Sequence, residues 1–449
     1  MSAPRGEFSS RFGFLMAATG SAVGLGNIWG FPTNAASNGG GAFLVAYVVL
    51  AFLLAYPALM AELIIGRHAK ANAVNALKGI AGSPGIARLG MSVGFAGMIT
   101  VTLILSFYSI VSSWMLAFMT ASFADLLRLE QLSNWLTTGS TTRDTLFTLL
   151  FYLLTIYVVV AGVKNGIEKW ASRLMPSLYF LLIALIVYVL TLDGAMDGVR
   201  MYLVPDFSRI ADPGLLLSAM GQAFFSLSLG VGTMLIYGSY VSKRENLPAI
   251  GGLVTVMDMS VAVLAGMLIL PAMSVAALNG IEIYNEQGGL IAGPALIISV
   301  LPALFERMGD AGILVAMAFF VLMSIACLTS SISMLEVPVS YVVEERGVSR
   351  PKASIVLGAV AALISLVIVF NFALLFDWVV RLTTEFSQPL LGFFFAIFAG
   401  WLWRRDQLLA EIRQGNPQAE TGLFWRIWPW YIRFVCPVII LAVYVQMIF

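Results

Sequence analysis

The chain has 449 residues, of which 60% are hydrophobic and only 11% are charged. Its mean hydropathy is +0.92. This is too little charge to cover a soluble domain of this size with polar surface, so the composition indicates a polytopic membrane protein. The formal net charge of +1 gives no sign of a nucleic-acid partner. Both cysteines, Cys327 and Cys436, lie in apolar runs and predict no disulfide framework.

Eleven apolar segments are long enough to cross a bilayer, and they predict an all-α fold with 11 transmembrane helices in one domain, residues 1–449. In chain order the predicted spans are residues 12–37, 42–66, 91–122, 145–162, 169–192, 213–240, 250–277, 311–344, 353–371, 374–403 and 425–448. The outer connections 193–212 and 278–310 are long. The second, with Pro294 and Pro302, predicts a re-entrant or capping hairpin.

The basic residues predict the orientation of the chain. The first apolar segment follows Arg5 and Arg11 directly, without a cleavable signal peptide, so we expect the N-terminus to stay in the cytoplasm. With the N-terminus inside, eighteen of the 25 lysines and arginines fall in cytoplasmic segments and five in outer segments. This distribution agrees with the positive-inside rule. An odd number of spans then places the C-terminus outside.

The first predicted span contains an unusual density of glycine, in the run Gly20-Ser-Ala-Val-Gly-Leu-Gly-Asn-Ile-Trp-Gly-Phe-Pro32. Each glycine inside a helix costs roughly 1 kcal/mol relative to alanine, and proline costs about 3 kcal/mol. A broken helix in a bilayer is tolerated where it lines a cavity inside the protein. There its free carbonyls can hold a cation, and the amide end of the next half-helix can hold a carboxylate. The alternative is a glycine-lined packing face.

A second interruption, Gly221-Gln-Ala-Phe-Phe-Ser-Leu-Ser-Leu-Gly-Val-Gly-Thr233, lies in the sixth span, five spans after the first. Interrupted helices at matching positions indicate an inverted-repeat transporter with its binding site at the membrane midplane. We therefore predict a five-plus-five repeat with broken helices 1 and 6. Its halves are residues 12–192 and 213–403, and residues 425–448 form an additional helix. The alternative is two unrelated flexible helices.

Oxygen-bearing side chains also occur in the spans that follow. Ala326, Thr329 and Ser330 share one face of the eighth span, which carries four hydroxyls within residues 329–333. Such hydroxyls suit an alkali cation, although a hydroxyl inside a membrane helix often bonds to the carbonyl four residues earlier. Asp258 is an acid within the apolar seventh span and is a candidate functional residue. The alternative for Asp258 is an acid that only pairs neighbouring helices.

These motifs, together with Asn38-Gly-Gly-Gly-Ala-Phe43 and Leu328-Thr-Ser-Ser331, make the chain similar to a known family. It resembles the neurotransmitter:sodium symporter family, in particular its bacterial eleven-span amino-acid transporters with the leucine-transporter fold. The resemblance runs from Arg11 to the last span. It implies sodium-coupled symport of an amino acid by alternating access in the bacterial inner membrane, and not an enzyme. The expected partners are a small-molecule substrate and lipid, with no nucleic acid and no obligatory protein partner.

The resemblance also implies two sodium sites. The first, Na1, consists of the carbonyl of Ala22, the side chains of Asn27, Ser226 and Asp258, and the carboxylate of the substrate. The second, Na2, consists of the carbonyls of Gly20, Val23 and Ala326 with the hydroxyls of Thr329 and Ser330. Ala262 replaces a serine that binds chloride in animal relatives, while Asp258 adds a fixed negative charge, so we expect chloride independence.

For the substrate, the resemblance implies a pocket at the two breaks. Gly24 stands where monoamine carriers have an aspartate, so a ligand with its own carboxylate is favoured. The pocket has no ionisable partner for a charged side chain, so a neutral hydrophobic or aromatic L-amino acid is expected. The predicted substrate-binding residues are Ala22, Gly24, Gly26, Ile104, Tyr108, Phe225, Ser226, Ser228, Val231, Ser330 and Met334.

The gates depart from the family pattern. Gly30 and Val380 replace an outer arginine and its acidic partner. Arg381 either pairs with Glu385 on its own helix or joins a rearranged outer gate. Phe225 over Tyr108 is expected to form an aromatic lid, and Arg5 with Glu344 and Tyr240 matches the inner gate.

Two other functions remain open from the sequence. A non-transporting amino-acid sensor on the same fold is one, because the charges of the outer gate are missing. A proton-coupled carrier is the other, because Asp258 can carry a proton. The only histidine, His68, is predicted in a loop, which argues against a histidine proton relay.

Overall fold

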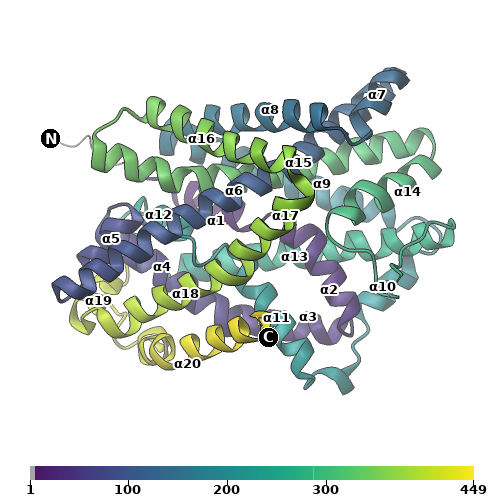
Figure 1. The fold of residues 1–449 in the computed structure, drawn as a ribbon. Helices are drawn as coiled ribbons and strands as arrows, with labels where there is room; N and C mark the ends of the chain where they lie inside the picture. Colours follow the sequence, from purple (N-terminus) through teal and green to yellow (C-terminus); the bar gives the residue numbers. More distant parts are fainter. Residues whose placement is uncertain (1–5, 287, 449) are drawn as a thin grey trace.

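The computed structural model describes residues 6–286 and 288–448, and these are almost entirely helical (Figure 1). Within this part of the chain, extended pairing is limited to isolated bridges between Gly40 and Pro205 and between Tyr284 and Leu290. Nine helices are long and apolar enough to cross a membrane, and a bent pair at the N-terminus makes ten, counting described residues only. The predicted all-α polytopic fold is therefore confirmed.

Among described residues, the first half of the chain contains four helices long enough to span a membrane and one bent pair. In order, its elements are α1 (Arg11–Ala22), η1 (Gly26–Gly30), α2 (Phe31–Ser37), α3 (Gly41–Leu50), η2 (Ala51–Ala55), α4 (Tyr56–Ala69), α5 (Ala73–Gly79), α6 (Pro84–Leu126), α7 (Glu130–Thr137), α8 (Thr141–Val160), η3 (Val163–Glu168), α9 (Lys169–Val189), α10 (Ala195–Leu203) and η4 (Phe207–Arg209).

The second half repeats this mixture of long and broken helices. Its elements are α11 (Pro213–Ser226), α12 (Thr233–Ser239), α13 (Leu247–Leu278), η5 (Leu296–Val300), α14 (Leu301–Arg307), α15 (Asp310–Arg346), α16 (Arg350–Phe370), α17 (Phe372–Val380), η6 (Arg381–Ser387), α18 (Gln388–Ile397), η7 (Phe398–Leu402), α19 (Arg405–Arg413) and α20 (Leu423–Ile448).

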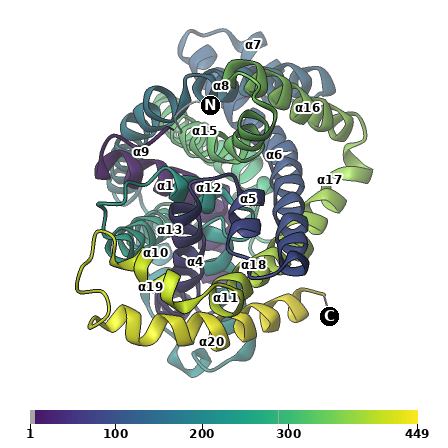
Figure 2. The same cartoon turned by 90° about the vertical axis from the view of Figure 1, so that its left-hand side faces the viewer.

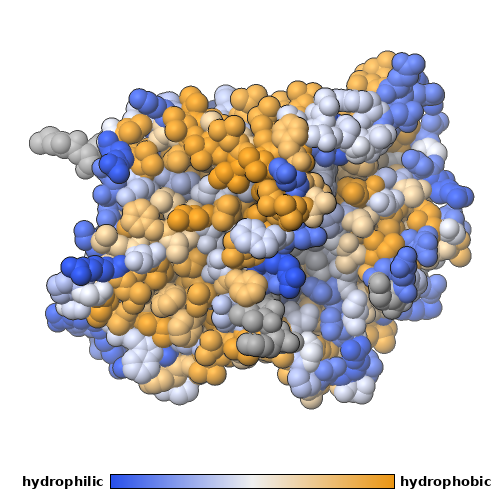
Figure 3. Space-filling view, viewed as in Figure 1, coloured by the Kyte–Doolittle hydropathy of each residue, from blue (hydrophilic) through white to orange (hydrophobic). Residues whose placement is uncertain are grey.

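Most spanning helices run across the view of Figure 1, and Figure 2 shows the same bundle from one end. The short helices α5 and α19 lie at one end of the bundle, and α7, α10 and α14 lie at the other. Hydrophobic residues cover the middle of the face in Figure 3, and hydrophilic residues gather toward its two ends. This distribution is the one a membrane domain requires, since the apolar middle faces lipid.

The first predicted span is bent by 60° between α1 and the helix that continues from η1 into α2. Ser10 caps α1 by accepting a hydrogen bond from the amide of Gly13, and the helix ends where Val23 takes an extended conformation. The chain resumes in a wider π-helical turn over η1, which continues directly into α2, and Pro32 lies in the first turn of α2. The break therefore falls inside the glycine-rich run.

The sixth predicted span consists of two short helices, α11 and α12. Between them the backbone has positive φ at Ser228 (52°), Gly230 (87°) and Gly232 (81°). Glycine adopts this conformation without the steric penalty that a side chain brings. Neither piece is long enough to count alone as a spanning helix, so the number of 11 spans stays a prediction. The repeat halves stay predictions as well.

The two connections predicted to lie outside carry short helices. Residues 193–212 contain α10 and η4, and residues 278–310 contain η5 and α14, while the re-entrant or capping role of the second connection stays a prediction. One expectation is wrong: His68 lies in the last turn of α4, not in a loop. Helix α4 continues one residue past His68, to Ala69. It ends there because Lys70 adopts a left-handed conformation and its N–H bonds to the carbonyl of Gly66.

Candidate functional site

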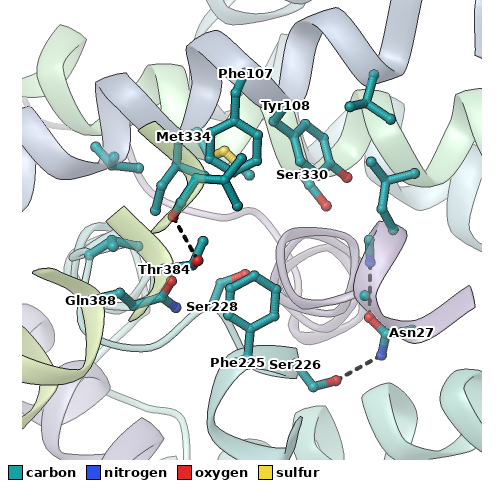
Figure 4. A pocket seen from close by; sticks show the side chains of 18 of the residues that line it. Asn27, Phe107, Tyr108, Phe225, Ser226, Ser228, Ser330, Met334, Thr384 and Gln388 are labelled. Atoms are coloured by element: carbon teal, nitrogen blue, oxygen red, sulfur yellow. Dashed lines mark hydrogen bonds between the residues drawn. The ribbon is translucent and has the colours of Figure 1, made fainter. Parts of the chain in front are cut away.

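A cavity of about 260 Å³ lies where the two broken helices meet α6, α15 and the segment from α17 to α18. Tyr108, Ser330 and Met334 line one side of it, and Phe225, Ser226 and Asn27 line the opposite side (Figure 4). All eleven residues predicted to bind substrate line this cavity. The structure thus brings together positions that are more than 300 residues apart in the chain.

The lining of the cavity is mostly apolar, and none of its lining residues carries a charge. The sequence analysis missed several of these residues, which are Leu25, Trp29, Val101, Phe107, Val111, Thr233, Pro294, Phe376, Thr384 and Gln388. Apolar residues in an apolar span give no local signal that separates a cavity wall from ordinary packing. A charged side chain placed here would lose its hydration without compensation.

One polar group in the cavity lacks a well-formed hydrogen bond. The hydroxyl of Tyr108 is buried close to Ser330 and the backbone of Leu25, but it forms no hydrogen bond of standard geometry to a described residue. It faces the backbone of Gly24, where an added Cβ would lie 3.0 Å from this hydroxyl and 3.3 Å from Oγ of Ser330. Because a buried polar group without a well-formed hydrogen bond is costly, this corner is suited to the polar end of a ligand.

A compact oxygen cluster borders the cavity at the predicted Na1 site. The amide nitrogen of Asn27 donates to Oγ of Ser226 and to Oδ1 of Asp258, both at 2.8 Å. Ser226 also donates to Oδ2 of Asp258 at 2.7 Å. The three side chains are almost fully buried, and the carbonyl-bearing residue Ala22 lies on the same cavity wall. The structure therefore gathers four residues from α1, η1, α11 and α13.

The residues of the predicted Na2 site also lie together, at the contact of α15 with the end of α1. The hydroxyl of Ser330 donates to the carbonyls of Val23, at 2.7 Å, and of Gly20, at 3.2 Å. Thr329 bonds within its own helix, and its Oγ1 lies 3.1 Å from the carbonyl oxygen of Ala326. A Cβ at Gly20 would lie 2.9 Å from Cβ of Thr329, so the close approach requires glycine.

The donors in both clusters are carbonyls, hydroxyls, an amide and one carboxylate. These hard oxygen ligands fit an alkali cation better than a transition metal. No group of three His, Cys, Asp or Glu side chains that could hold a metal occurs among the residues the structure describes. Both sets therefore fit sodium by the chemistry of their donors.

Neutral groups occupy the positions of the predicted outer gate. A Cβ at Gly30 would have only Oε1 of Gln222 nearby, at 3.7 Å, and Gln222 donates to the carbonyl of Gly26 at 3.2 Å. Val380 lines the cavity. Arg381 is exposed and bonds to Glu385 at 3.3 Å, which is the i,i+4 pair left open by the sequence. Its role in gating stays a prediction.

The expected aromatic lid is not closed. The side chain of Phe225 is 38% exposed within the cavity wall, and its ring forms no aromatic pair with the ring of Tyr108. A Cβ at Gly26 would be 3.4 Å from the ring of Phe225, which thus lies over η1. The described conformation leaves the cavity accessible past this ring.

At the predicted inner gate, the N-terminal segment packs against α1 and α12 through Phe8. Phe8 is buried, and its N–H donates to the carbonyl of Tyr240 at 3.0 Å. Glu344 accepts hydrogen bonds from the backbone and side-chain nitrogens of Asn72, at 2.8 and 2.9 Å. Arg5 lies outside the described residues, so its pairing with Glu344 stays a prediction.

The sequence analysis did not single out two buried acids, Glu336 and Glu62, that hold α12 and the unwound segment before it through hydrogen bonds. Glu336 is fully buried in α15, accepts a hydrogen bond of 2.6 Å from Tyr240 and forms an ion pair with Arg350. Glu62 of α4 accepts hydrogen bonds from the amides of Gly230, at 2.7 Å, and Leu235, at 3.3 Å. Both acids were visible in the sequence as charges within apolar spans, which is the signal that identified Asp258.

The sequence of the chain is similar to those of known sodium-dependent transporters. The profile of the sodium:neurotransmitter symporter family matches residues 5–146 and 131–449. The chain is 35% identical to an uncharacterized sodium-dependent transporter, YhdH, of Bacillus subtilis, over 98% of this chain and 97% of that protein. It is 30% identical to an uncharacterized sodium-dependent transporter of Haemophilus influenzae, over 99% and 98% of the two chains.

A solved structure is similar over the whole fold. The crystal structure of MhsT in complex with L-phenylalanine matches with a TM-score of 0.82 and 35% identity, covering 99% of this chain and 100% of that chain. Family profile, sequence relatives and fold therefore agree across nearly the whole length. The chain belongs to the sodium:neurotransmitter symporter family, whose members are sodium-coupled membrane transporters and not enzymes.

Proposed function

We propose that the protein takes up a neutral L-amino acid with a hydrophobic or aromatic side chain, together with sodium and without chloride. The main support is the cavity itself, which offers one buried hydroxyl without a well-formed hydrogen bond, that of Tyr108, within an uncharged and mostly apolar wall. The similar transporter MhsT was crystallised with L-phenylalanine, a ligand of this class. An amino acid with a charged side chain would be desolvated here without a partner.

In this proposal the substrate and one sodium ion share a contact. The carboxylate would lie between the hydroxyl of Tyr108 and an ion held by Asn27, Ser226 and Asp258 with the carbonyl of Ala22. Since each ligand then stabilises the other, each raises the other's affinity by the same factor. A second sodium would be held by the carbonyls of Gly20, Val23 and Ala326 with the hydroxyls of Thr329 and Ser330.

Chloride independence follows from the charge beside the first ion. Asp258 is 1% exposed and already supplies a negative charge to the cluster. Ala262, one turn further along α13, is fully buried and has no hydroxyl to donate to an anion. A second negative ion at this place would be repelled by the carboxylate and would lack a donor.

Alternating access would then use the two ends of the cavity. The accessible ring of Phe225 marks the side from which substrate enters, and the buried Phe8 marks the side that must open for release. With the N-terminus in the cytoplasm, entry is from outside and release is inward. This orientation also places the C-terminus outside, in a bacterial inner membrane.

The proposal is tested by the thermal stability of the purified protein with each of the twenty amino acids, in sodium and in choline buffer. A ligand at a hundred times its dissociation constant stabilises the folded state by about 2.7 kcal/mol. We expect stabilisation by hydrophobic or aromatic amino acids only in sodium, whether or not chloride is replaced by gluconate. Stabilisation that does not require sodium would refute the shared contact.

Uptake into proteoliposomes separates the remaining alternatives. A symporter accumulates the stabilising amino acid when a sodium gradient is imposed. Binding without accumulation would identify a sensor, and accumulation driven by a pH gradient without sodium would identify a proton-coupled carrier.

A further inference from the structure

Helix α20 approaches the end of η7 at one point, where Gly400 has no side chain. A Cβ at Gly400 would lie 2.8 Å from Cα of Arg433, so only glycine permits this approach. The indole N–H of the next residue, Trp401, donates to the carbonyl of Arg433 at 2.7 Å. These contacts hold Arg433 against Trp401.

The guanidinium of Arg433 lies on a platform of aromatic rings. Its central carbon is 4.2 Å from the centroid of Trp401 and 5.5 Å from that of Phe434. The two rings are themselves in contact, with centroids 5.4 Å apart. Arg433 is exposed and forms no ion pair within the part of the chain that the structure describes. The rings orient a positive charge that has no anionic partner in the described protein.

The surroundings of this charge face lipid. Helix α20 is long and apolar enough to cross a membrane. Along it runs a stripe of exposed apolar residues with helical spacing, namely Ile427, Trp430, Phe434, Val438 and Leu441. Arg433 lies beside this stripe. A charge inside the hydrocarbon is costly, so such an arginine is tolerated where it reaches the level of the lipid headgroups.

Two observations place Arg433 at that level. Trp401, on which it lies, is followed within four residues by Arg404 and Arg405, where the span ends. Figure 2 shows α19, which follows the end of that span, beside the first half of α20. Tryptophan and arginine together are typical of this boundary.

We propose that Arg433, on the platform of Trp401 and Phe434, binds the phosphate of an anionic phospholipid whose acyl chain lies along the exposed stripe of α20. A guanidinium presents two parallel N–H donors that match a phosphate, and the ring faces hold this fork in one plane. Arg426, seven residues earlier and on the same face, adds a second positive charge. A zwitterionic lipid is disfavoured because it carries its own cation to the site.

The test is native mass spectrometry of the delipidated full-length protein, titrated with phosphatidylglycerol and separately with phosphatidylcholine. We expect tighter binding of phosphatidylglycerol, and about fivefold weaker binding after Arg433→Gln, which corresponds to about 1 kcal/mol for one basic residue at the membrane surface. Arg88→Gln is the matched control. Arg88 is also an exposed arginine near the start of a spanning helix but has no ring platform, so its change is expected to stay below twofold.

Three results would overturn the proposal: equal affinity for both lipids, equal loss in Arg433→Gln and Arg88→Gln, or displacement of the lipid by inorganic phosphate at millimolar concentration. The last result would assign the site to free phosphate. Trp401→Leu keeps the charge but removes the platform, and it is expected to weaken phosphatidylglycerol binding as well. The Trp401→Leu variant therefore tests the proposed lipid site even if Arg433→Gln does not fold.

Discussion

Ser330 joins α15 to the end of α1 at the proposed Na2 site, beside a second hydrogen bond from Ser21 of α1 to Ser333 of α15. Its hydroxyl reaches the carbonyls of Gly20 and Val23 in α1, while Ser330 itself belongs to α15. Thr329, beside it, bonds only within α15. One hydroxyl therefore contacts the partner helix and the other is available to turn toward an ion.

We predict that Thr329→Val combined with Ser330→Ala lowers the sodium affinity of substrate binding at least tenfold. Each lost hydroxyl removes a ligand from a buried cation, and an unsatisfied buried group costs about 1–3 kcal/mol. The measurement is substrate-induced thermal stabilisation as a function of sodium concentration. Ser354→Ala serves as control, because Ser354 is a buried serine in α16 that lines no part of the cavity. An unchanged sodium dependence in the double variant would show that the site is misplaced.

At the scale of elements, the unwound segment between α11 and α12 is held from two sides. Glu62 of α4 accepts the amide of Gly230, and Gln388 of α18 donates to the carbonyl of Leu229 at 2.9 Å. A Cβ at Gly230 would lie 2.3 Å from the carbonyl oxygen of Gln388. The position of α18, and with it the outer part of the cavity, therefore depends on this contact.

Alanine substitutions at two glycines of this segment distinguish the effect of backbone strain from the effect of a steric clash with a neighbouring helix. Gly230 and Gly232 both have positive φ, so Gly→Ala strains the backbone at either position. Only at Gly230 does the new methyl group collide with backbone of another helix, since at Gly232 it would be 3.5 Å from Cβ of Ala73. We expect Gly230→Ala to abolish substrate binding and Gly232→Ala to retain it with lower thermal stability. Equal effects would mean that the contact with Gln388 is unimportant.

The short helix α19 is attached to the end of α4 by a buried ion pair. Arg67 donates to a carboxylate oxygen of Glu411 at 2.6 Å, and both side chains are at most 1% exposed. His68 lies 3.3 Å from the second carboxylate oxygen. Burial by itself would raise the pKa of Glu411, but the hydrogen bond from His68 and the charge of Arg67 outweigh it and lower the pKa below its ordinary value of 4.5.

This shift predicts the pH dependence of stability. Because the folded state lowers the pKa of Glu411, the ion pair contributes its full stabilisation above pH 4.5 and loses it as the pH falls through the folded-state value. We expect Glu411→Gln to be less stable by about 3 kcal/mol at neutral pH, since Arg67 is left buried without its partner, and to lose less stability than wild type on acidification. Melting temperatures between pH 3 and 8 measure both effects.

Asp406→Asn is the control for this prediction. Asp406 lies on the same helix and pairs with Arg404, but both side chains are at least 64% exposed. An exposed pair contributes little, so the variant should follow wild type at neutral pH. A similar loss in both variants would contradict the assignment to the buried pair.

At the scale of the whole molecule, the outer entrance is neutral where the family pattern has a charged pair. Val380 lines the cavity, Gly30 ends η1 just outside the lining, and neither provides a charge. Losing both charges is physically consistent, because one charge left alone in an apolar entrance would be costly. In the proposed alternating-access cycle, this entrance would therefore close through neutral contacts.

We predict that Gly30→Arg alone impairs sodium-driven uptake at least tenfold and that Gly30→Arg with Val380→Asp recovers most of it. There is room for the new side chain, because a Cβ at Gly30 meets only Gln222. The single variant introduces a charge without a partner, and the double variant provides one. Uptake into proteoliposomes measures both, and equal impairment would contradict the idea that the charges are missing as a pair.

The sequence predicted the spans and most of the cavity because membrane proteins carry strong local signals. A stretch of about 20 apolar residues is visible without knowledge of its neighbours, and glycine clusters mark the places where helices break. The ends of helices were less well predicted. Helix α6 begins at Pro84 rather than at residue 91, because its first turns mix polar and apolar residues.

Taken alone, the sequence determined the membrane class, the places of the two interruptions and the oxygen-bearing residues near them. The tertiary structure decided what those residues meet: that Ser330 bonds to α1, that the hydroxyl of Tyr108 forms no hydrogen bond of standard geometry to a described residue, and that Gln388 holds Leu229. It also decided that Arg433 lies on the ring of Trp401 at the exposed surface. The physical reason is that apolarity and backbone propensity act within a few residues of the chain. Hydrogen bonds and ring contacts, in contrast, join positions that only the packing of helices brings within 3–4 Å of one another.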